Sequence, residues 1–210
     1  GLPASNHFAG RDKQKLYAEY RYLWPPCKLT GPMADDAVKH AEFMLYNRER
    51  FAGLSRTFPG VPWHLFGVIS LLEMGLNFNG TILNGNPWNK KTTDFPPGLG
   101  PWKSYEEAAQ WGFVHECKGW NFDWATIKWN DPGEYFYFLE SWNGHNARTE
   151  PQYSLTTPHG ASPYLYSGTG FYQKGKKQEN PTRFNPDLVS QQPGCMAIAL
   201  ALKLKGVDLF

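Results

Sequence analysis

The longest apolar run of the chain covers residues 61–74, and one carboxyl, that of Glu73, interrupts it near the end. A helix that is hydrophobic on all sides belongs in the interior of a protein. Gly75 follows at a position where it can end such a helix. On the helix, Glu73 shares a face with Ile69 and Phe66, which precede it by four and seven residues. The pattern therefore predicts a buried helix that carries a poorly solvated carboxyl at its end.

Two effects are expected to keep this carboxyl protonated nearer neutral pH. Desolvation disfavours the anion, and the partial negative charge at a helix C-terminus disfavours it again. A carboxyl with a raised pKa can serve as a general acid. The alternative is a partly exposed glutamate paired with a lysine or an arginine. The residues alone leave both interpretations of Glu73 open.

The rest of the chain shows mostly helical patterns with capping residues and helix breakers at their ends. Residues 76–97 differ, because they are rich in Asn, Gly and Thr and contain two Asn-Gly pairs, which are typical of β-hairpins. A small β-hairpin or an irregular lobe is expected there, with a floppy loop as the alternative. Residues 145–185 are expected to be irregular. The sequence predicts a mainly α (α+β) fold in a single domain over residues 1–210. The expected helices cover residues 11–23, 33–51, 61–74, 104–117, 123–130, 134–142 and 195–204.

Composition narrows the possible functions. The chain is 41% hydrophobic, which excludes general disorder. A net charge of +2 gives no case for nucleic acid, and no apolar run approaches the length of a membrane span. The cysteines Cys27, Cys117 and Cys195 lack the spacing of a metal or redox motif. One disulfide with a free thiol and three buried thiols are both open.

Aromatic residues are unusually frequent, with 9 Trp, 11 Tyr and 14 Phe. Most are expected in the core, but Trp and Tyr also suit stacking on sugar rings, because they join a flat apolar face to a polar group. Trp88 lies in the predicted hairpin. Tyr164 and Tyr166 would lie on the same side of an extended segment. These three residues are the candidates for stacking on a glycan.

Short motifs along the chain match the pattern of one enzyme family. The matching residues in the first half are Val61-Pro62-Trp63, Gly67, Ile69, Glu73, Leu76, Phe78, Leu83, Asn84-Gly85, Pro87, Thr92, Pro97-Gly98, Pro101 and Tyr105-Glu106. Together they resemble a family of bacterial and phage lysozyme-like peptidoglycan hydrolases, distantly similar to goose-type lysozymes. Further blocks, such as Ser162-Pro163-Tyr164-Leu165-Tyr166 and Gln191-Gln192-Pro193-Gly194, extend the likeness over residues 55–205.

The chain also departs from the family pattern. Ser70 replaces the family histidine, and Met74-Gly75 replaces the Ser-Ser pair after the acid. Asn86 stands where the family has the Asp of Asn-Gly-Asp-Pro, and Lys91 replaces the hairpin arginine. The change at Asn86 removes the most obvious second carboxylate. The base therefore lies elsewhere, or the chain acts on a different glycan.

The resemblance implies a lysozyme-like fold, in which a buried central helix ends in a catalytic Glu73 and a small β-hairpin lobe follows. It implies hydrolysis of a β-1,4-linked glycan, with peptidoglycan as the first choice and Glu73 as the acid that protonates the leaving oxygen. Asp94 is the nearest candidate base in sequence, and Asp123 and Glu140 are weaker ones. Glu140 is expected instead to hold the core through a buried hydrogen bond. Inversion and retention are both open.

Goose-type relatives can work with one evident acid and a water held by neutral groups. Asn84, Asn86 and Thr92 are the residues that would position such a water in this chain. The alternative is that these side chains only satisfy the turns in which they lie.

Other functions stay open besides a muramidase. They are an endo-acting cellulase or chitinase on the same fold, a lytic transglycosylase in which the sugar's own hydroxyl replaces water, and a non-catalytic glycan-binding module. None of them requires a cofactor, and the histidines show no paired spacing typical of metal ligands. The expected partner is a polysaccharide, bound by a monomer with no nucleic-acid or membrane partner. The expected location is secreted or directed to a cell wall, with a phage lysin made in the host cytoplasm as the alternative.

Overall fold

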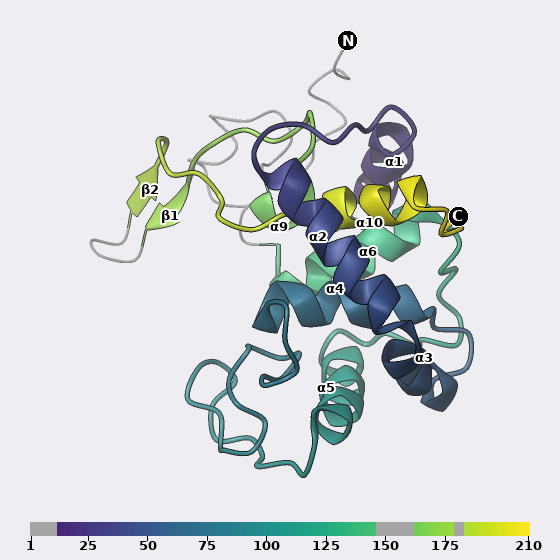
Figure 1. Ribbon diagram of the computed structural model, residues 1–210, viewed down its shortest axis with the longest axis vertical. Coiled ribbons are helices and arrows are strands. Elements are labelled where there is room, and N and C mark those ends of the chain that lie inside the picture. Colours follow the sequence, from purple (N-terminus) through teal and green to yellow (C-terminus); the bar gives the residue numbers. More distant parts are fainter. Residues whose placement is uncertain (1–11, 146–161, 179–182) are drawn as a thin grey trace. The chain divides into compact units, whose positions relative to one another are not determined.

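The computed structural model describes residues 12–145, 162–178 and 183–210. These residues are mainly helical, as the sequence predicts. In chain order the elements are α1 (Lys13–Leu23), α2 (Met33–Tyr46), α3 (Arg48–Thr57), α4 (Trp63–Met74), α5 (Tyr105–Gly119), α6 (Pro132–Asn143), α9 (Pro163–Tyr166), β1 (Lys176–Gln178), β2 (Arg183–Asn185) and α10 (Cys195–Leu204) (Figure 1).

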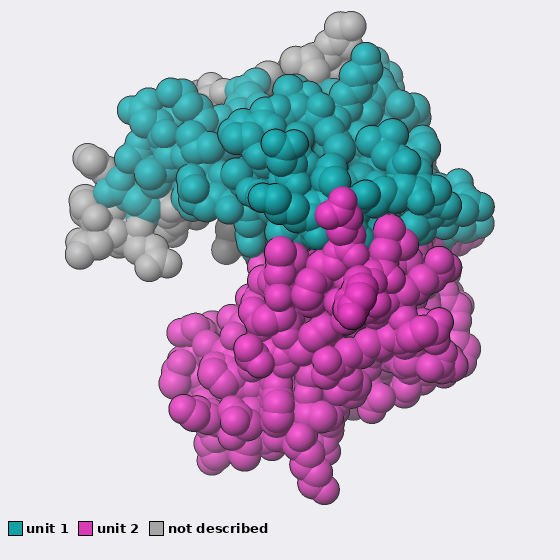
Figure 2. All heavy atoms as spheres, viewed as in Figure 1, with its two compact units in different colours: residues 1–41, 130–210 teal, residues 42–129 magenta. Residues whose placement is uncertain are grey.

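The chain forms two compact units (Figure 2). The first unit comprises residues 1–41 and 130–210, and the second unit comprises residues 42–129. The first unit is thus built from both ends of the sequence given, and the second from its middle. The single domain expected over residues 1–210 stays a prediction.

In the first unit, α1 packs along α6. The rings of Trp24 and Phe136 lie 5.3 Å apart, centroid to centroid. The guanidinium of Arg21 donates two hydrogen bonds to the carboxylate of Asp131, at 2.9 and 2.7 Å. Asp131 also accepts the backbone N–H of Glu134, so it caps the start of α6 as well. One carboxylate therefore both begins α6 and ties it to α1.

Two carboxyls are buried in the core of the first unit. Glu140 is fully buried and accepts a hydrogen bond from the hydroxyl of Tyr20. Glu19 accepts a hydrogen bond from the hydroxyl of Tyr166, at 2.6 Å. A buried carboxyl without such a donor would be strongly destabilising. The geometry of Glu140 agrees with the core role that the sequence favours for it.

The apolar run at the end of the sequence forms α10, and its residues from Cys195 to Leu202 are buried, as expected. The irregular stretch expected over residues 145–185 is wrong in part. The short helix α9 and the antiparallel pair β1–β2, with Lys176 opposite Asn185, lie in or at the edge of it. Residues 167–175, between α9 and β1, are irregular apart from one isolated bridge at Thr169, as expected. Residues 146–161 and 179–182 fall outside the described residues.

In the second unit, α4 is the central element. Every residue from His64 to Leu72 is buried, which confirms the predicted core helix. Its contacts are largely aromatic: Phe66 lies 5.8 Å from Phe58 and 5.0 Å from Phe113, measured between ring centroids. The helix is therefore held between α3, which leads into Phe58, and α5, which carries Phe113.

Two expected helices are wrong. Residues 33–51 form two helices, because Asn47 leaves helical geometry at φ −101° and ψ 19° and its side chain donates to the carbonyl of Phe43. Residues 123–130 form turns. The carboxylate of Asp123 accepts the N–H of Ala125 only two residues on, which closes an Asx turn in place of a helix cap.

The three cysteines are free and buried. The sequence left open one disulfide with a free thiol or three buried thiols, and the structure contains three buried thiols. Among the helices of the described residues, none combines the length and apolar character needed to cross a membrane.

Candidate active site

Glu73 lies in the last turn of α4 and is partly exposed, whereas residues 64–72 before it in the helix are buried. The helix ends at Gly75, which has φ +76° and donates its N–H to the carbonyl of Leu71 at 3.0 Å. The helix thus delivers one carboxyl from the core to the surface of the second unit. The raised pKa expected of Glu73 stays a prediction.

The loop between α4 and α5 packs directly against this helix end. Gly85 has φ +75°, and a Cβ placed there would lie 2.2 Å from the carbonyl oxygen of Glu73. At Gly80 a Cβ would lie 2.6 Å from the carbonyl oxygen of Gly85 and 2.8 Å from the Cβ of Met74. Both positions therefore need glycine, because a side chain has no room between the loop and the helix. The Asn84-Gly85 pair brings the loop into contact with the candidate acid.

The β-hairpin expected over residues 76–97 is not formed as a strand ladder. The loop between α4 and α5 carries no strand arrow (Figure 1). A single isolated bridge joins Gly80 and Pro87 in it. Side-chain hydrogen bonds take the place of the ladder, because asparagine amides can imitate the backbone in turns. The Asn-Gly pairs therefore predict the turns but not the strands.

Asn84 and Asn86 organise the loop. The side-chain oxygen of Asn84 accepts the N–H of Asn86 at 3.0 Å, and its amide group donates to the carbonyl of Asp94 at 3.2 Å. The side-chain oxygen of Asn86 accepts the N–H groups of Thr93 and Asp94, at 2.8 and 2.9 Å. Its amide group donates to the carboxylate of Asp94 at 2.8 Å. These amides satisfy the turns in which they lie, which is the alternative to their holding a water.

Thr92 forms its hydrogen bonds within the loop, and its role in holding a water stays a prediction. It is buried, its hydroxyl donates to the carbonyl of Pro96 at 2.6 Å, and its oxygen accepts the N–H of Leu99 at 3.0 Å. Its side chain closes the turn over residues 92–99. Asp94 is exposed and uses one carboxylate oxygen to accept from Asn86. Its role as a base stays a prediction.

Trp88 is partly exposed, and its indole N–H donates to the carbonyl of Phe78 at 2.9 Å across the loop. Its own carbonyl accepts the N–H of Trp102 at 2.8 Å. The indole is thus fixed by a hydrogen bond while part of its surface is open. Trp88 keeps the properties that a stacking residue needs.

Tyr164 and Tyr166 do not lie in an extended segment. They belong to α9 in the first unit, and both are buried. Tyr166 is 1% exposed and its hydroxyl donates to Glu19, so stacking of its ring on a sugar is excluded. Tyr164 is 6% exposed and lines a pocket of about 390 Å³ with Asn143 and Gln191. The prediction from the spacing of Tyr164 and Tyr166 is wrong, because a single helical turn that begins at Pro163 replaces the expected extended segment.

Ser70, which replaces the family histidine, has a structural role in this chain. Its hydroxyl is hydrogen-bonded to that of Tyr105, and both side chains are buried. Burial raises the pKa of Tyr105 far above its usual value, so the phenol stays protonated. The contact joins α4 to the first turn of α5, three residues before Glu73.

Nearby, Arg50 stands over the ring of Phe78, 3.9 Å from its centroid, and forms an ion pair of 2.5 Å with Glu106. Glu106 follows Tyr105 in the first turn of α5, where negative charge is favoured. Because Phe78 belongs to the loop, Arg50 links α3, the loop and α5.

Comparison of the chain with protein-family models, with curated proteins and with solved structures finds no match. The described residues also contain no group of three or more His, Cys, Asp or Glu side chains arranged to hold a metal ion. The groups of this region that can take part in chemistry are Glu73, the loop packed on it and the aromatic residues of the second unit.

Proposed function

We propose that the chain is a glycoside hydrolase that cleaves a β-1,4-linked glycan, with peptidoglycan as the first substrate and Glu73 as the general acid. The observation that carries the proposal is the position of Glu73. It is the one carboxyl of α4, it lies where this buried helix reaches the surface, and the loop is packed on its backbone through Gly85. The sequence resemblance to lysozyme-like peptidoglycan hydrolases supports the same assignment.

In this mechanism the protonated Glu73 donates its proton to the glycosidic oxygen as the bond to the sugar breaks. The positive charge that develops on the sugar is then met by a nucleophile. A second carboxylate would stand about 5–5.5 Å away in a retaining enzyme and about 6.5–9.5 Å away in an inverting one. Asp94 is the candidate for this second group. Trp88 would stack on a sugar of the bound chain.

A lytic transglycosylase is the second candidate, and the hydrogen bonds of the loop favour it. Asn84, Asn86 and Thr92 form hydrogen bonds within the loop, which leaves fewer of their polar atoms to hold a hydrolytic water. A transglycosylase needs no such water, because a hydroxyl of the sugar itself attacks. Cellulose and chitin are the alternative glycans. A secreted or wall-directed location follows for a peptidoglycan substrate.

The test measures products released from peptidoglycan, chitin oligomers and soluble cellulose, with their masses determined. We expect the wild type to cleave one of these glycans and Glu73→Gln to reduce turnover by about 10²- to 10⁴-fold, since the amide cannot donate the proton. Products lighter by one water would identify a transglycosylase.

Glu116→Gln is the matched control. Glu116 is also a partly exposed glutamate near a helix end, and burial raises its pKa. Its replacement should leave turnover unchanged. No cleavage of the three glycans by the wild type would refute the hydrolase and transglycosylase proposals for them and would favour a glycan-binding module.

A further inference from the structure

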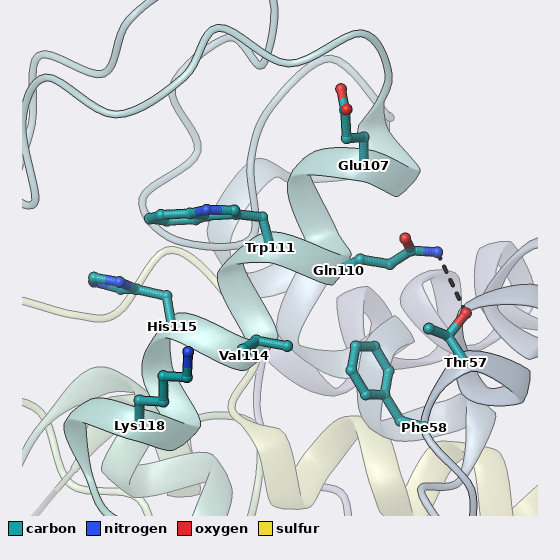
Figure 3. A pocket seen from close by; sticks show the side chains of 8 residues that line it. All are labelled: Thr57, Phe58, Glu107, Gln110, Trp111, Val114, His115 and Lys118. Carbon is teal, nitrogen blue, oxygen red and sulfur yellow. Dashed lines mark hydrogen bonds between the residues drawn. The ribbon is translucent and has the colours of Figure 1, made fainter.

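A groove of about 480 Å³ lies between the end of α3 and one face of α5, within the second unit (Figure 3). We call it the α3–α5 groove. Its α5 side is a helical stripe, because Gln110, Trp111, Val114 and His115 recur at spacings of three and four residues. The opposite face of α5, which includes Phe113, is buried in the core. The helix therefore has a second, outward face with a composition of its own.

The indole of Trp111 lines one side of the groove. Trp111 is 40% exposed, which is high for so large an apolar side chain. Its ring stacks on that of His115, with 4.7 Å between centroids and 15° between planes, and the two rings project from α5 in the same direction in Figure 3. The ring of Trp102 lies 5.5 Å from it. Neighbouring rings thus hold the indole in position while leaving it accessible.

The floor of the groove is apolar and its edges are polar. Phe58 and Val114 supply the floor. At one edge the amide of Gln110 donates to the hydroxyl of Thr57 at 3.3 Å, a long hydrogen bond that a ligand hydroxyl can replace (Figure 3). Lys118 adds a charged donor. Mostly apolar walls with a few placed polar groups are typical of ligand sites, and the volume is within their usual range.

We propose that the α3–α5 groove is a non-catalytic binding site for a β-1,4-linked chain of N-acetylated hexosamines. Such a sugar has an apolar C–H face that fits the indole of Trp111. Its acetamido methyl group fits the floor formed by Phe58 and Val114, and its hydroxyl and amide groups match the donors and acceptors at the edges. The inference goes beyond the proposed activity, because it involves neither Glu73 nor turnover.

The experiment titrates the β-1,4-linked hexamer of N-acetylglucosamine into the full chain by calorimetry. All proteins carry Glu73→Gln, which prevents consumption of the ligand by the proposed activity. We expect Trp111→Ala to weaken one class of sites by about tenfold or more, since removal of a central aromatic anchor typically costs this much. Trp111→Phe keeps an aromatic face and should retain part of the lost affinity.

Trp120→Ala is the matched control. Trp120 is 41% exposed, lies directly after α5 and is not one of the described residues that line the groove. Its replacement should change affinity by less than about twofold, the usual outcome away from an anchor. The hexamer of glucose, which lacks the acetamido methyl, should bind the parent about tenfold more weakly, in line with the loss of an apolar group from a fitted pocket.

Several results would overturn the inference. The first is that the Glu73→Gln parent does not bind the hexamer of N-acetylglucosamine, and the second is that Trp111→Ala binds it as tightly as the parent does. The third is that Trp111→Ala and Trp120→Ala lose the same affinity. The fourth is that the parent binds the hexamers of N-acetylglucosamine and of glucose equally well. The proposed activity can fail separately. A wild type that binds through Trp111 but cleaves nothing would retain the groove and refute the hydrolase. If cleavage depends on Glu73 but Trp111→Ala binds the hexamer as the parent does, the hydrolase is retained and the binding site in the α3–α5 groove is refuted.

Discussion

At position 85 the backbone passes so close to the end of α4 that no side chain fits. The absent Cβ of Gly85 would lie 2.2 Å from the carbonyl oxygen of Glu73, and the residue has φ +75°. Gly98 lies in the same loop at φ +80°, but a Cβ placed there has nothing within 4 Å. The two glycines therefore share a backbone conformation and differ in the close contact.

We expect Gly85→Ala to destabilise the protein by about 3 kcal/mol or more, because strain from positive φ and a clash with the backbone add together. Gly98→Ala carries only the first cost, about 1–2 kcal/mol. Denaturant unfolding measures both values. Turnover of the glycan should fall further in Gly85→Ala, since the loop must move away from Glu73. Equal effects of the two substitutions would show that the contact with Glu73 is unimportant.

At the scale of the element, α4 is so fully enclosed that it buries a histidine. His64 is 4% exposed, and burial, aided by the positive charge of Arg48, lowers its pKa to about 4. In the unfolded chain the pKa of His64 is about 6.5. Between these two values the unfolded state binds more protons than the folded state. Stability therefore falls as the pH is lowered through this window.

The contribution of His64 to this loss is about 3 kcal/mol between pH 7 and pH 4, from a pKa difference of about 2.5. Burial also lowers the pKa of His40, which acts in the same direction. We expect a His64→Leu variant to lose less stability over this range than the wild type. Unfolding curves at several pH values provide the test. Parallel pH profiles for the two proteins would mean that His64 does not titrate as its burial requires.

The elements also show where sequence patterns suffice and where they do not. Apolar runs fix α4 and α10, because enclosure on all sides depends on hydrophobicity alone. The break at Asn47 depends on one side chain reaching the carbonyl of Phe43, which periodicity does not register. In the loop, the Asn-Gly pairs mark turns, but Asn86 bonds to residues seven and eight positions later. Such contacts depend on tertiary structure.

The candidate site was predictable to a similar degree. The position of Glu73 follows from the apolar run before it. The burial of Tyr166 does not, since its partner Glu19 lies 147 residues away. The stripe around Trp111 is visible in the sequence as a spacing of three and four residues. The periodicity of apolar residues marks the buried face of a helix, however, and does not identify a binding site on the outward face.

At the scale of the whole molecule, the buried thiols are natural probes of the two units. Cys27 and Cys195 belong to the first unit and Cys117 to the second. Burial raises the pKa of Cys27 and of Cys117 to about 12, so both are protonated and unreactive in the folded protein. A thiol reagent then reports the opening of the unit that contains each cysteine.

We expect Cys27 and Cys195 to become reactive together as denaturant is added and Cys117 to do so at a different midpoint, because each unit has its own core. Mass spectrometry of labelled peptides follows the three sites in one experiment. Complete labelling of all three in strong denaturant is the control. A single shared midpoint would instead support the single cooperative domain that the sequence predicts.

The division of the chain also bears on the order in which it folds during synthesis. The second unit, residues 42–129, is continuous, whereas the first needs residues on both sides of it. Arg21 of α1 and its partner Asp131 are separated by 110 positions. Because a ribosome releases the N-terminal side first, the second unit is complete while α1 still lacks α6. The helix that presents Glu73 can therefore assemble on the nascent chain before the ends of the first unit meet.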